Sequence, residues 1–293
     1  NGIIESPEAC DDSNTNNADG CSSTCALESG WKCAGQPSRC MNGVPYPPST
    51  VITNITWDFA NIARAAQGSD LWPTTWSDDD NLYTDWGDGG GFGGDNTLGR
   101  VSFGVGKVQG TGSSWQGFNI WGGLNPLSNQ TPTTGKSNGG IISINGVLYV
   151  FVEEQNVWTR SKLWTSSDHG LNWIDRGWIL EWPNAAFGVP GLIQFGKDYN
   201  GSRDNFVYGY SERGMGFTPP GLGLFRVPKD QLANKVSYEF FSGLDVNSNP
   251  TWSTDVNQRQ PVFSDPNGVN WGVNAMYNPV LGRYIMAVAH TTT

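Results

Sequence analysis

Charged side chains and histidine are scarce in this chain, and their scarcity excludes several classes of protein. Of the 293 residues only 15% are charged and two are histidine, and 27 acidic residues outnumber 17 lysines and arginines to give a net charge of −10. Nucleic-acid binding depends on clusters of Lys and Arg, so we expect no nucleic-acid partner. No apolar run reaches the length of about 18 residues that a membrane-spanning helix needs, so we expect no membrane span.

Cysteine is absent after residue 40, although five cysteines come before that point: Cys10, Cys21, Cys25, Cys33 and Cys40. Such density in a small polar segment favours a disulfide-stapled unit from an oxidising compartment. Zinc is the alternative, but no histidine lies nearby and no Cys-x-x-Cys pair occurs. We therefore expect an extracellular or cell-surface protein in which residues 1–42 form a disulfide-rich unit.

Glycine and tryptophan are abundant, at 39 and 14 residues. Many glycines and aromatic residues with few charges suit an all-β protein with tight turns, because long helices need more Ala, Glu, Lys and Leu. The proline-rich stretch 43–50 predicts a linker. Residues 51–293 then form a second, all-β domain.

One plan recurs in this domain: a strand, a polar turn, a second strand and often a third. The predicted strand pairs are 71–77 with 82–86, 140–144 with 147–152, 189–195 with 206–211, and 271–277 with 283–289. Asn145-Gly146 between two apolar runs is a strong hairpin signal. Hairpins that need neighbours to bury their faces predict a β-propeller, with a β-sandwich as the alternative.

The fourth copy of the plan lacks a third strand. A propeller of this kind would have five blades, and its ring must close. Either the segment 51–58 closes the ring or the sequence stops before a last blade, and we expect the second.

Residues 68–94 gather three Trp, one Tyr and six Asp beside a run of glycines. Aromatic faces stack on sugar rings, and carboxylates bind hydroxyl groups or transfer protons. The stretch therefore points to a carbohydrate. Its middle, Asp78, Asp79 and Asp80, is expected to be a turn, because short Asp side chains bond nearby backbone.

Hairpin geometry places the start of each first strand and the end of each second strand at the same edge of the sheet. If the first strands line a central channel, as in a propeller, this edge lies at one end of the channel. We expect the functional residues on that face. The candidate catalytic residues there are Asp70, Asp85, Glu153, Glu212, Arg213 and His290. The candidate substrate-binding residues are Trp72, Trp86, Asp88, Lys136, Tyr210 and Trp271.

Carboxylates from several blades at one face fit glycoside hydrolysis, which needs an acid on the leaving oxygen and a base or nucleophile at the anomeric carbon. Asp70 or Asp85 would be the base or nucleophile, and Glu153 or Glu212 the acid. Trp72 and Trp86 would be sugar platforms, one beside each candidate base.

Two other functions remain open. A polysaccharide lyase would use His290 with Tyr210 and Arg213 to abstract a proton and neutralise a uronate. A non-catalytic carbohydrate-binding or fibre-forming surface module would use the same aromatic residues for adhesion. The oligomeric state is not indicated.

Ser166-Ser-Asp168-His-Gly170-Leu-Asn-Trp173 matches the Asp-box pattern Ser-x-Asp-x-Gly-x-x-Trp, and so resembles sialidase-like propellers. In those families the motif is a structural turn between outer strands, which implies that Asp168 and His169 are not catalytic. The sialidase arginine triad is not evident.

The run from Trp72-Pro-Thr-Thr-Trp to Thr84-Asp-Trp-Gly-Asp-Gly89, with Asn278-Pro-Val-Leu-Gly-Arg-Tyr284, resembles secreted bacterial proteins of the DUF4185 type. These are propellers, and some members are glycoside hydrolases acting on arabinan-like polymers. The resemblance implies a polysaccharide substrate.

The segments Cys10-Asp-Asp-Ser-Asn14 and Asp19-Gly-Cys-Ser-Ser-Thr-Cys25 resemble the Myxococcus-type cysteine-rich repeat. The first cysteine of that pattern is absent, which accounts for the odd count. No cofactor is expected to be required, but Ca²⁺ could be held by the oxygens of Asp11, Asp12, Asn14 and Asp19. The alternative is that these residues only form turns.

Overall fold

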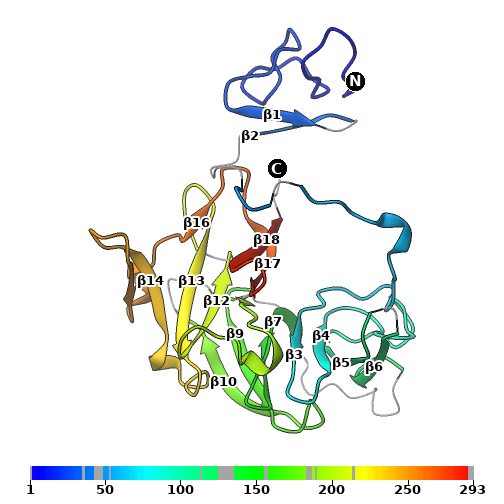
Figure 1. The fold of residues 1–293 in the computed structure, drawn as a ribbon, viewed down its shortest axis with the longest axis vertical. Coiled ribbons are helices and arrows are strands. Elements are labelled where there is room, and N and C mark those ends of the chain that lie inside the picture. The colour runs from blue at the N-terminus through cyan, green and yellow to red at the C-terminus, as the bar shows by residue number, and fades with distance from the viewer. Residues whose placement is uncertain are drawn as a thin grey trace.

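The structure is a computed structural model that describes residues 2–34, 37–42, 49–52, 54–112, 114–124, 135–154, 158–182, 187–188, 190–212 and 215–289. Its elements are almost entirely β-strands, with four single-turn 3₁₀ helices at Phe59–Asn61, Lys197–Tyr199, Lys235–Ser237 and Val256–Gln258 in the described part (Figure 1). This confirms the predicted all-β class.

The N-terminal unit is a hairpin of β1 (Trp31–Ala34) and β2 (Arg39–Asn42) with loops folded beside it. Two disulfides staple it, Cys10 to Cys21 and Cys33 to Cys40. Cys25 forms no disulfide; its thiol donates to the Glu8 carboxylate at 3.4 Å, and this contact raises the pKa of Cys25. The expected disulfide bonding therefore holds for four of the five cysteines.

Four antiparallel sheets follow, here called blades I to IV. Blade I is β3 (Thr74–Trp76), β4 (Leu82–Trp86), β5 (Gly104–Gln109) and β6 (Gln116–Trp121); blade II is β7 (Lys136–Ile144), β8 (Val147–Glu153), β9 (Ser161–Ser166) and β10 (Ile174–Leu180). Blade III is β11 (Gly191–Leu192), β12 (Phe206–Ser211), β13 (Gly221–Pro228), β14 (Glu239–Leu244) and β15 (Pro250–Ser253), with β16 (Phe263–Ser264) paired to β13. Blade IV is β17 (Asn270–Asn278) and β18 (Arg283–Ala289).

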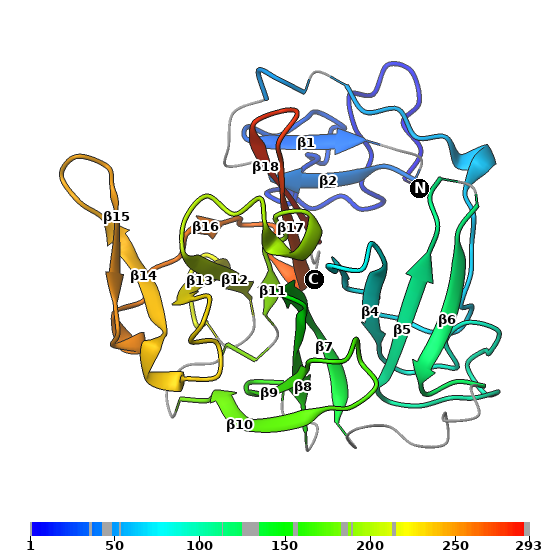
Figure 2. The same ribbon diagram turned by 60° about the horizontal axis from the view of Figure 1, so that its bottom comes forward.

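The first strands of the blades are neighbours around one axis: β3 lies against β7, β7 against β11, and β11 against β17 (Figure 2). Each blade runs outward from this inner strand. The arrangement is propeller-like, as the hairpin repeat predicts, and differs from the two facing sheets of a sandwich.

Gln194 joins the inner strands of all four blades. Its side chain accepts a hydrogen bond from the Thr75 hydroxyl and donates one to the Ile141 carbonyl, both at 2.9 Å. Its backbone donates to Ala275 at 3.1 Å and accepts from Tyr277 at 3.0 Å. One residue of blade III therefore ties blade III to blades I, II and IV.

Apolar side chains fill the spaces between successive blades because each strand turns alternate residues to its two faces. Tyr83 and Val105 of blade I pack with Leu148 and Val150 of blade II. A larger core joins blade II to blade III, in which the Phe187 ring lies 5.0 Å from that of Phe240 and 6.0 Å from that of Phe225. Blades III and IV share a smaller cluster.

Gln194→Ala is expected to lower the free energy of unfolding by about 1–3 kcal/mol, because two side-chain hydrogen bonds worth roughly 0.5–1.5 kcal/mol each are lost. Chemical denaturation followed by fluorescence measures the change. Gln231→Ala is the matched control, since that side chain only accepts from Asn234 at an exposed turn. An equal loss in both variants would contradict the central role of Gln194.

Candidate functional site

Three of the candidate acids lie within one residue of the end of the second strand in successive blades. Asp85 in β4 and Glu153 in β8 have no exposed surface, and Glu212, directly after β12, is half-buried. A carboxyl without exposed surface cannot touch a polymer in this conformation. In this conformation Asp85 and Glu153 therefore cannot be the two catalytic carboxyls of a glycoside hydrolase.

Asp70 and Asp88 come together at the inner end of blade I. The backbone of Asp70 pairs with that of Gly87, donating at 3.1 Å and accepting at 3.0 Å, and Asp88 is the next residue. The Asp88 carboxylate forms an ion pair with Arg100 at 3.2 Å. We call Asp70, Asp88, Arg100 and Lys136 the rim site.

The glycine run after Asp88 holds this arrangement. A Cβ at Gly89 would lie 2.3 Å from the Gly68 carbonyl oxygen, and one at Gly90 would lie 2.1 Å from that of Leu98. Only glycine lets the backbone fold back this tightly. The Gly91 backbone also donates to the Ser69 hydroxyl at 2.9 Å, which fixes the loop beside Asp70.

Asp70 differs electrostatically from Asp78 and Asp79 at the turn of blade I, whose pKa values are lowered. Loss of hydration raises its pKa, since protein atoms crowd the carboxyl although part of it stays exposed. The negative charge of Asp88 adds to this rise, and the positive charges of Arg100 and Lys136 oppose it. Two acids that interact in this way make one favour the protonated form.

Lys136 brings blade II to the same rim. It opens β7, where its Cα faces that of Glu153, and its ammonium lies 5.6 Å from the centre of the Trp158 ring. Its charge acts on Asp70 across the boundary between blades I and II. That residues of blades I and II share this edge stays a prediction, which the effect of the Lys136 charge on Asp70 favours.

The two predicted sugar platforms lie in different environments. Trp86 has no exposed surface, its indole N–H donates to the Gly89 carbonyl at 2.9 Å, and a Cβ at Gly104 would lie 2.2 Å from its ring. Trp72 is half-buried and stacks on Trp86 with ring centres 5.2 Å apart. Trp86 thus supports Trp72 and has no face to offer a sugar, which corrects the expectation for Trp86.

The residues named for a lyase are not assembled in the described part of the chain. Tyr210 packs in the small cluster with Leu222 and Met286, and burial raises the pKa of its hydroxyl. Arg213 and His290 lie outside the described residues, as does the side chain of Trp271, whose backbone lies in β17.

The N-terminal Asp and Asn residues form turns. Asp11 accepts from the Ser13 backbone at 2.8 Å, which lowers the pKa of Asp11, and Asn14 accepts from the Asn16 backbone at 2.6 Å. Asp12 accepts from the Asn14 backbone at 3.3 Å. Asp11, Asp12 and Asp19 do not bring three carboxylates within reach of one ion.

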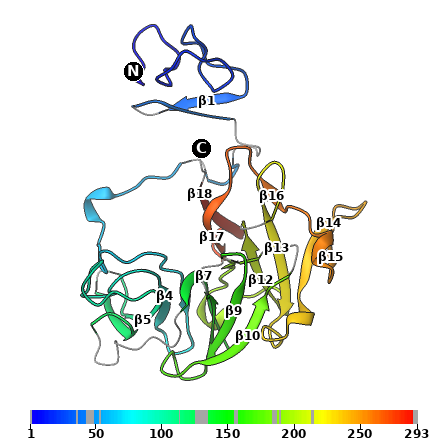
Figure 3. The same ribbon diagram turned by 180° about the vertical axis from the view of Figure 1, so that it is seen from behind.

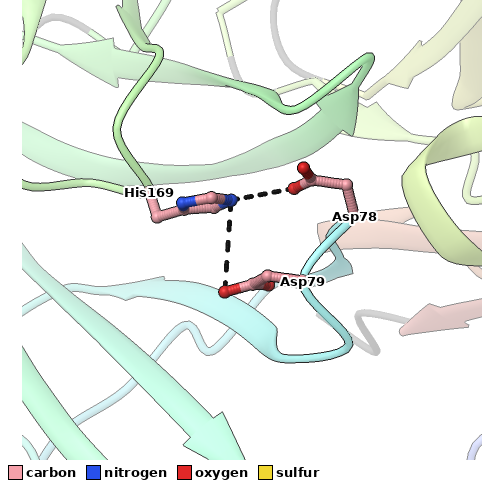
Figure 4. Close-up of side chains that lie close together, drawn as sticks. All are labelled: Asp78, Asp79 and His169. Atoms are coloured by element: carbon pink, nitrogen blue, oxygen red, sulfur yellow. Dashed lines mark hydrogen bonds and ion pairs between the residues drawn. The ribbon is translucent and has the colours of Figure 1, made fainter.

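Among the described residues, the group whose ligand atoms could hold a metal ion is Asp78, Asp79 and His169, all within 4.8 Å of one another (Figure 4). His169 Nε2 lies 2.8 Å from Asp78 and 4.0 Å from Asp79. Tyr83 donates to Asp79 at 2.7 Å, and its ring stacks on His169 with centres 5.6 Å apart. The sequence predicts a turn at these aspartates but does not reveal this contact with blade II.

His169 is placed by the turn between β9 and β10. The Ser166 hydroxyl donates to Asp168 at 2.8 Å, Asp168 accepts from the Asn172 backbone at 2.8 Å, and the Trp173 indole donates to Gly170 at 3.0 Å. The turn thus satisfies its own polar groups and leaves the His169 ring to face blade I.

Arg100 is the residue of the rim site that sequence reasoning misses. It directly follows Gly99, six residues after the glycine run ends at Gly94, and no local pattern assigns it to Asp88. A single basic residue at the end of a loop that begins with an Asp is the sequence signal that could have identified Arg100.

No family model matches the chain, and no curated protein matches it. Among solved structures, the RS223 β-xylosidase aligns with a TM-score of 0.39 at 13% identity, covering 78% of this chain and 77% of that one. No helix among the described residues has the length and apolarity to cross a membrane.

Asp78 is expected to stabilise the fold in a pH-dependent way, because its hydrogen bond with His169 lowers the pKa of Asp78. A lowered folded-state pKa contributes stability above the ordinary value near 3.9, and this is lost as pH falls through the folded-state pKa. His169→Asn, which keeps a residue that tolerates positive φ, should lower Tm by about 1–2 °C at pH 6. Thermal scans should show no difference from wild type near pH 2; a constant difference would contradict this.

Proposed function

We propose that this chain is an extracellular glycoside hydrolase acting on a polysaccharide, with Asp70 and Asp88 as its two catalytic carboxyls. One arrangement carries the proposal: Asp70 is exposed and its backbone pairs with Gly87, the neighbour of Asp88, whose carboxylate pairs with Arg100 at 3.2 Å. Loss of hydration and the charge of Asp88 raise the pKa of Asp70, which agrees with this arrangement. Trp72 lies two residues from Asp70 and is half-buried, so one ring edge or face remains for a sugar.

The two carboxyls have the different environments that this chemistry needs. Cleavage of a glycosidic bond requires one protonated acid and one carboxylate. Asp70, with its raised pKa, supplies the proton to the leaving oxygen. Asp88, which forms an ion pair with Arg100, acts at the anomeric carbon as base or nucleophile.

This assignment differs from the expectation that Glu153 or Glu212 is the acid. Glu153 has no exposed surface, whereas Asp70 is accessible. Lys136 is suited to orient a substrate hydroxyl or acidic group at the rim, because its positive charge acts on the Asp70 carboxyl. The disulfides support an extracellular location.

The resemblance to DUF4185-type proteins supports a polymer of arabinan kind as the first substrate to test. The lyase alternative rests on Arg213 and His290, outside the described residues, and on Tyr210, which is packed in the core. No observation favours it. Any Ca²⁺ at Asp11, Asp12, Asn14 and Asp19 would be structural in this proposal.

A panel of polysaccharides, assayed for new reducing ends and for unsaturated uronates, tests the reaction. Wild type should release reducing ends from at least one polymer, and Asp70→Asn and Asp88→Asn should each lower kcat at least about 100-fold. Asp80→Asn, an exposed turn aspartate with positive φ that Asn tolerates, is the matched control. No product from any glycan, or unsaturated products alone, would contradict the hydrolase proposal.

The raised pKa of Asp70 also predicts a stability effect that does not depend on knowing the substrate. A carboxyl whose folded-state pKa is raised gives its full stability below the ordinary value near 3.9, and this is lost as pH rises through the folded-state pKa. Asp70→Asn removes the cost of the charged form, so its Tm should exceed that of wild type by about 1–2 °C at pH 7 and match it at pH 3. A Tm below wild type at pH 7 would contradict the raised pKa.

A further inference from the structure

Glycines on one face of blade I leave room for two aromatic rings to lie directly on the sheet. A Cβ at Gly104 of β5 would come within 2.2 Å of the Trp86 ring, and one at Gly117 of β6 within 2.2 Å of the Phe92 ring. Gly106 shares the face of Gly104, because alternate residues of a strand point the same way, and its Cβ would lie 3.2 Å from the Phe92 ring. A larger residue at Gly104 or Gly117 would displace a ring, so these strands are suited to carry an aromatic layer.

Three half-buried rings of this layer form a row. The ring centre of Trp72 lies 5.1 Å from that of Phe92, which in turn lies 6.5 Å from that of Trp115. Asn119 holds the middle ring in place, because its side chain accepts from the Phe92 backbone N–H at 2.9 Å and donates to the Phe92 carbonyl at 2.8 Å. Rings fixed in this way lose little conformational freedom when they bind a ligand.

A groove of about 440 Å³ runs along this row and is called the aromatic groove. Residues 54–70 reach blade I as a mostly extended trace (Figure 3), and Ala65 and Ala66 of this segment close one side of the groove. Among the described residues, those that line it include no charged side chain, although the chain has a net charge of −10. The size and lining of the groove therefore suit a neutral ligand with apolar faces.

The aromatic groove continues from the rim site through two short segments of blade I. Trp72 follows Asp70 by two residues, and Phe92 follows Asp88 by four. Each segment thus has a carboxyl of the rim site at one end and a ring of the groove at the other. A polymer bound at the two carboxyls would meet the ring of Trp72 first, and then those of Phe92 and Trp115.

We propose that the aromatic groove binds neutral sugar units of the polymer, next to the unit whose bond is cleaved. The C–H groups on one face of a sugar ring pack on an aromatic ring, while the hydroxyl groups at its edge stay in water. A uronate or sulfated sugar is disfavoured, because its charge would lose water here without gaining a partner. This inference rests on the proposed function for the class of ligand, and adds Phe92 and Trp115 as residues that determine specificity.

Binding of oligosaccharides to Asp70→Asn, which should leave the ligands uncleaved, tests the inference. Isothermal titration calorimetry compares the hexasaccharides of arabinose, xylose and glucose with their disaccharides and with hexagalacturonate. At least one neutral hexasaccharide should bind at least about fivefold more tightly than its disaccharide and than hexagalacturonate. The inference is overturned if every neutral hexasaccharide binds no more tightly than its disaccharide, or if hexagalacturonate binds most tightly.

Substitution of Trp115 in the Asp70→Asn chain identifies the surface involved. Trp115→Ala should remove the gain in affinity from disaccharide to hexasaccharide, and Trp115→Phe, which keeps an aromatic face, should retain most of it. Phe118→Ala is the matched control, since Phe118 is 42% exposed on the opposite face of β6, where its ring centre lies 5.7 Å from the Lys107 ammonium. Thermal denaturation checks that each variant is folded. Equal hexasaccharide affinities of Trp115→Ala and Phe118→Ala would overturn the inference.

Kinetics separate this inference from the proposed reaction. In the active chain, Trp115→Ala should raise KM for the polymer at least about fivefold and leave kcat within about twofold of wild type. Hydrolysis with an unchanged KM in Trp115→Ala would overturn the groove and leave the hydrolase proposal standing. Hexasaccharide binding that depends on Trp115, without product from any polymer, would overturn the hydrolase proposal and leave the groove as a binding site.

Discussion

The hydrogen bonds of Gln194 are the constraint on which the remaining structure depends. Four inner strands from sequence positions far apart must meet at one axis, where their polar groups would otherwise lose water without a partner. Gln194 meets this need for blades I, II and IV at once. The network continues through Thr75, which accepts from the Ser143 backbone, and Ser143, whose hydroxyl donates to Asp198.

This network positions the rim site through blade I. Thr75 is held by Gln194 in the inner strand, and Trp72 and Asp70 lie just before that strand. The pKa values of the carboxyls at the two ends of blade I are then shifted in opposite directions. At the turn, hydrogen bonds satisfy Asp78 and Asp79 and lower the pKa of both; at the rim, crowding raises the pKa of Asp70. Within blade I, Asp70 at the rim is therefore the carboxyl whose raised pKa fits the acid role proposed for it.

The inner hairpins could be predicted from the sequence because their signals are local. Alternation and turn residues gave 206–211 and 283–289 with the bounds that β12 and β18 have. The outer strands β6 and β10 were missed because most of their residues are exposed or only half-buried, which leaves a weak apolar pattern in the sequence. At the rim, the prediction from strand-end position that these acids share an edge stays a prediction. Burial depends on packing between blades, so the lack of exposed surface at Asp85 and Trp86 could not be recognised from the sequence. The partnership of Asp88 with Arg100 depends on how the glycine run folds back, which no local pattern encodes.

The central claim is that Asp70 and Asp88 form an interacting acid pair at the rim of this ring. The most direct measurement is a ¹³C NMR titration of the aspartate carboxyls, with Asp70 assigned by the loss of its signal in Asp70→Asn. The account predicts that the pKa of Asp70 lies above its ordinary value near 3.9 and falls when Asp88 is replaced by Asn. An ordinary pKa for Asp70 that Asp88→Asn leaves unchanged would contradict the claim.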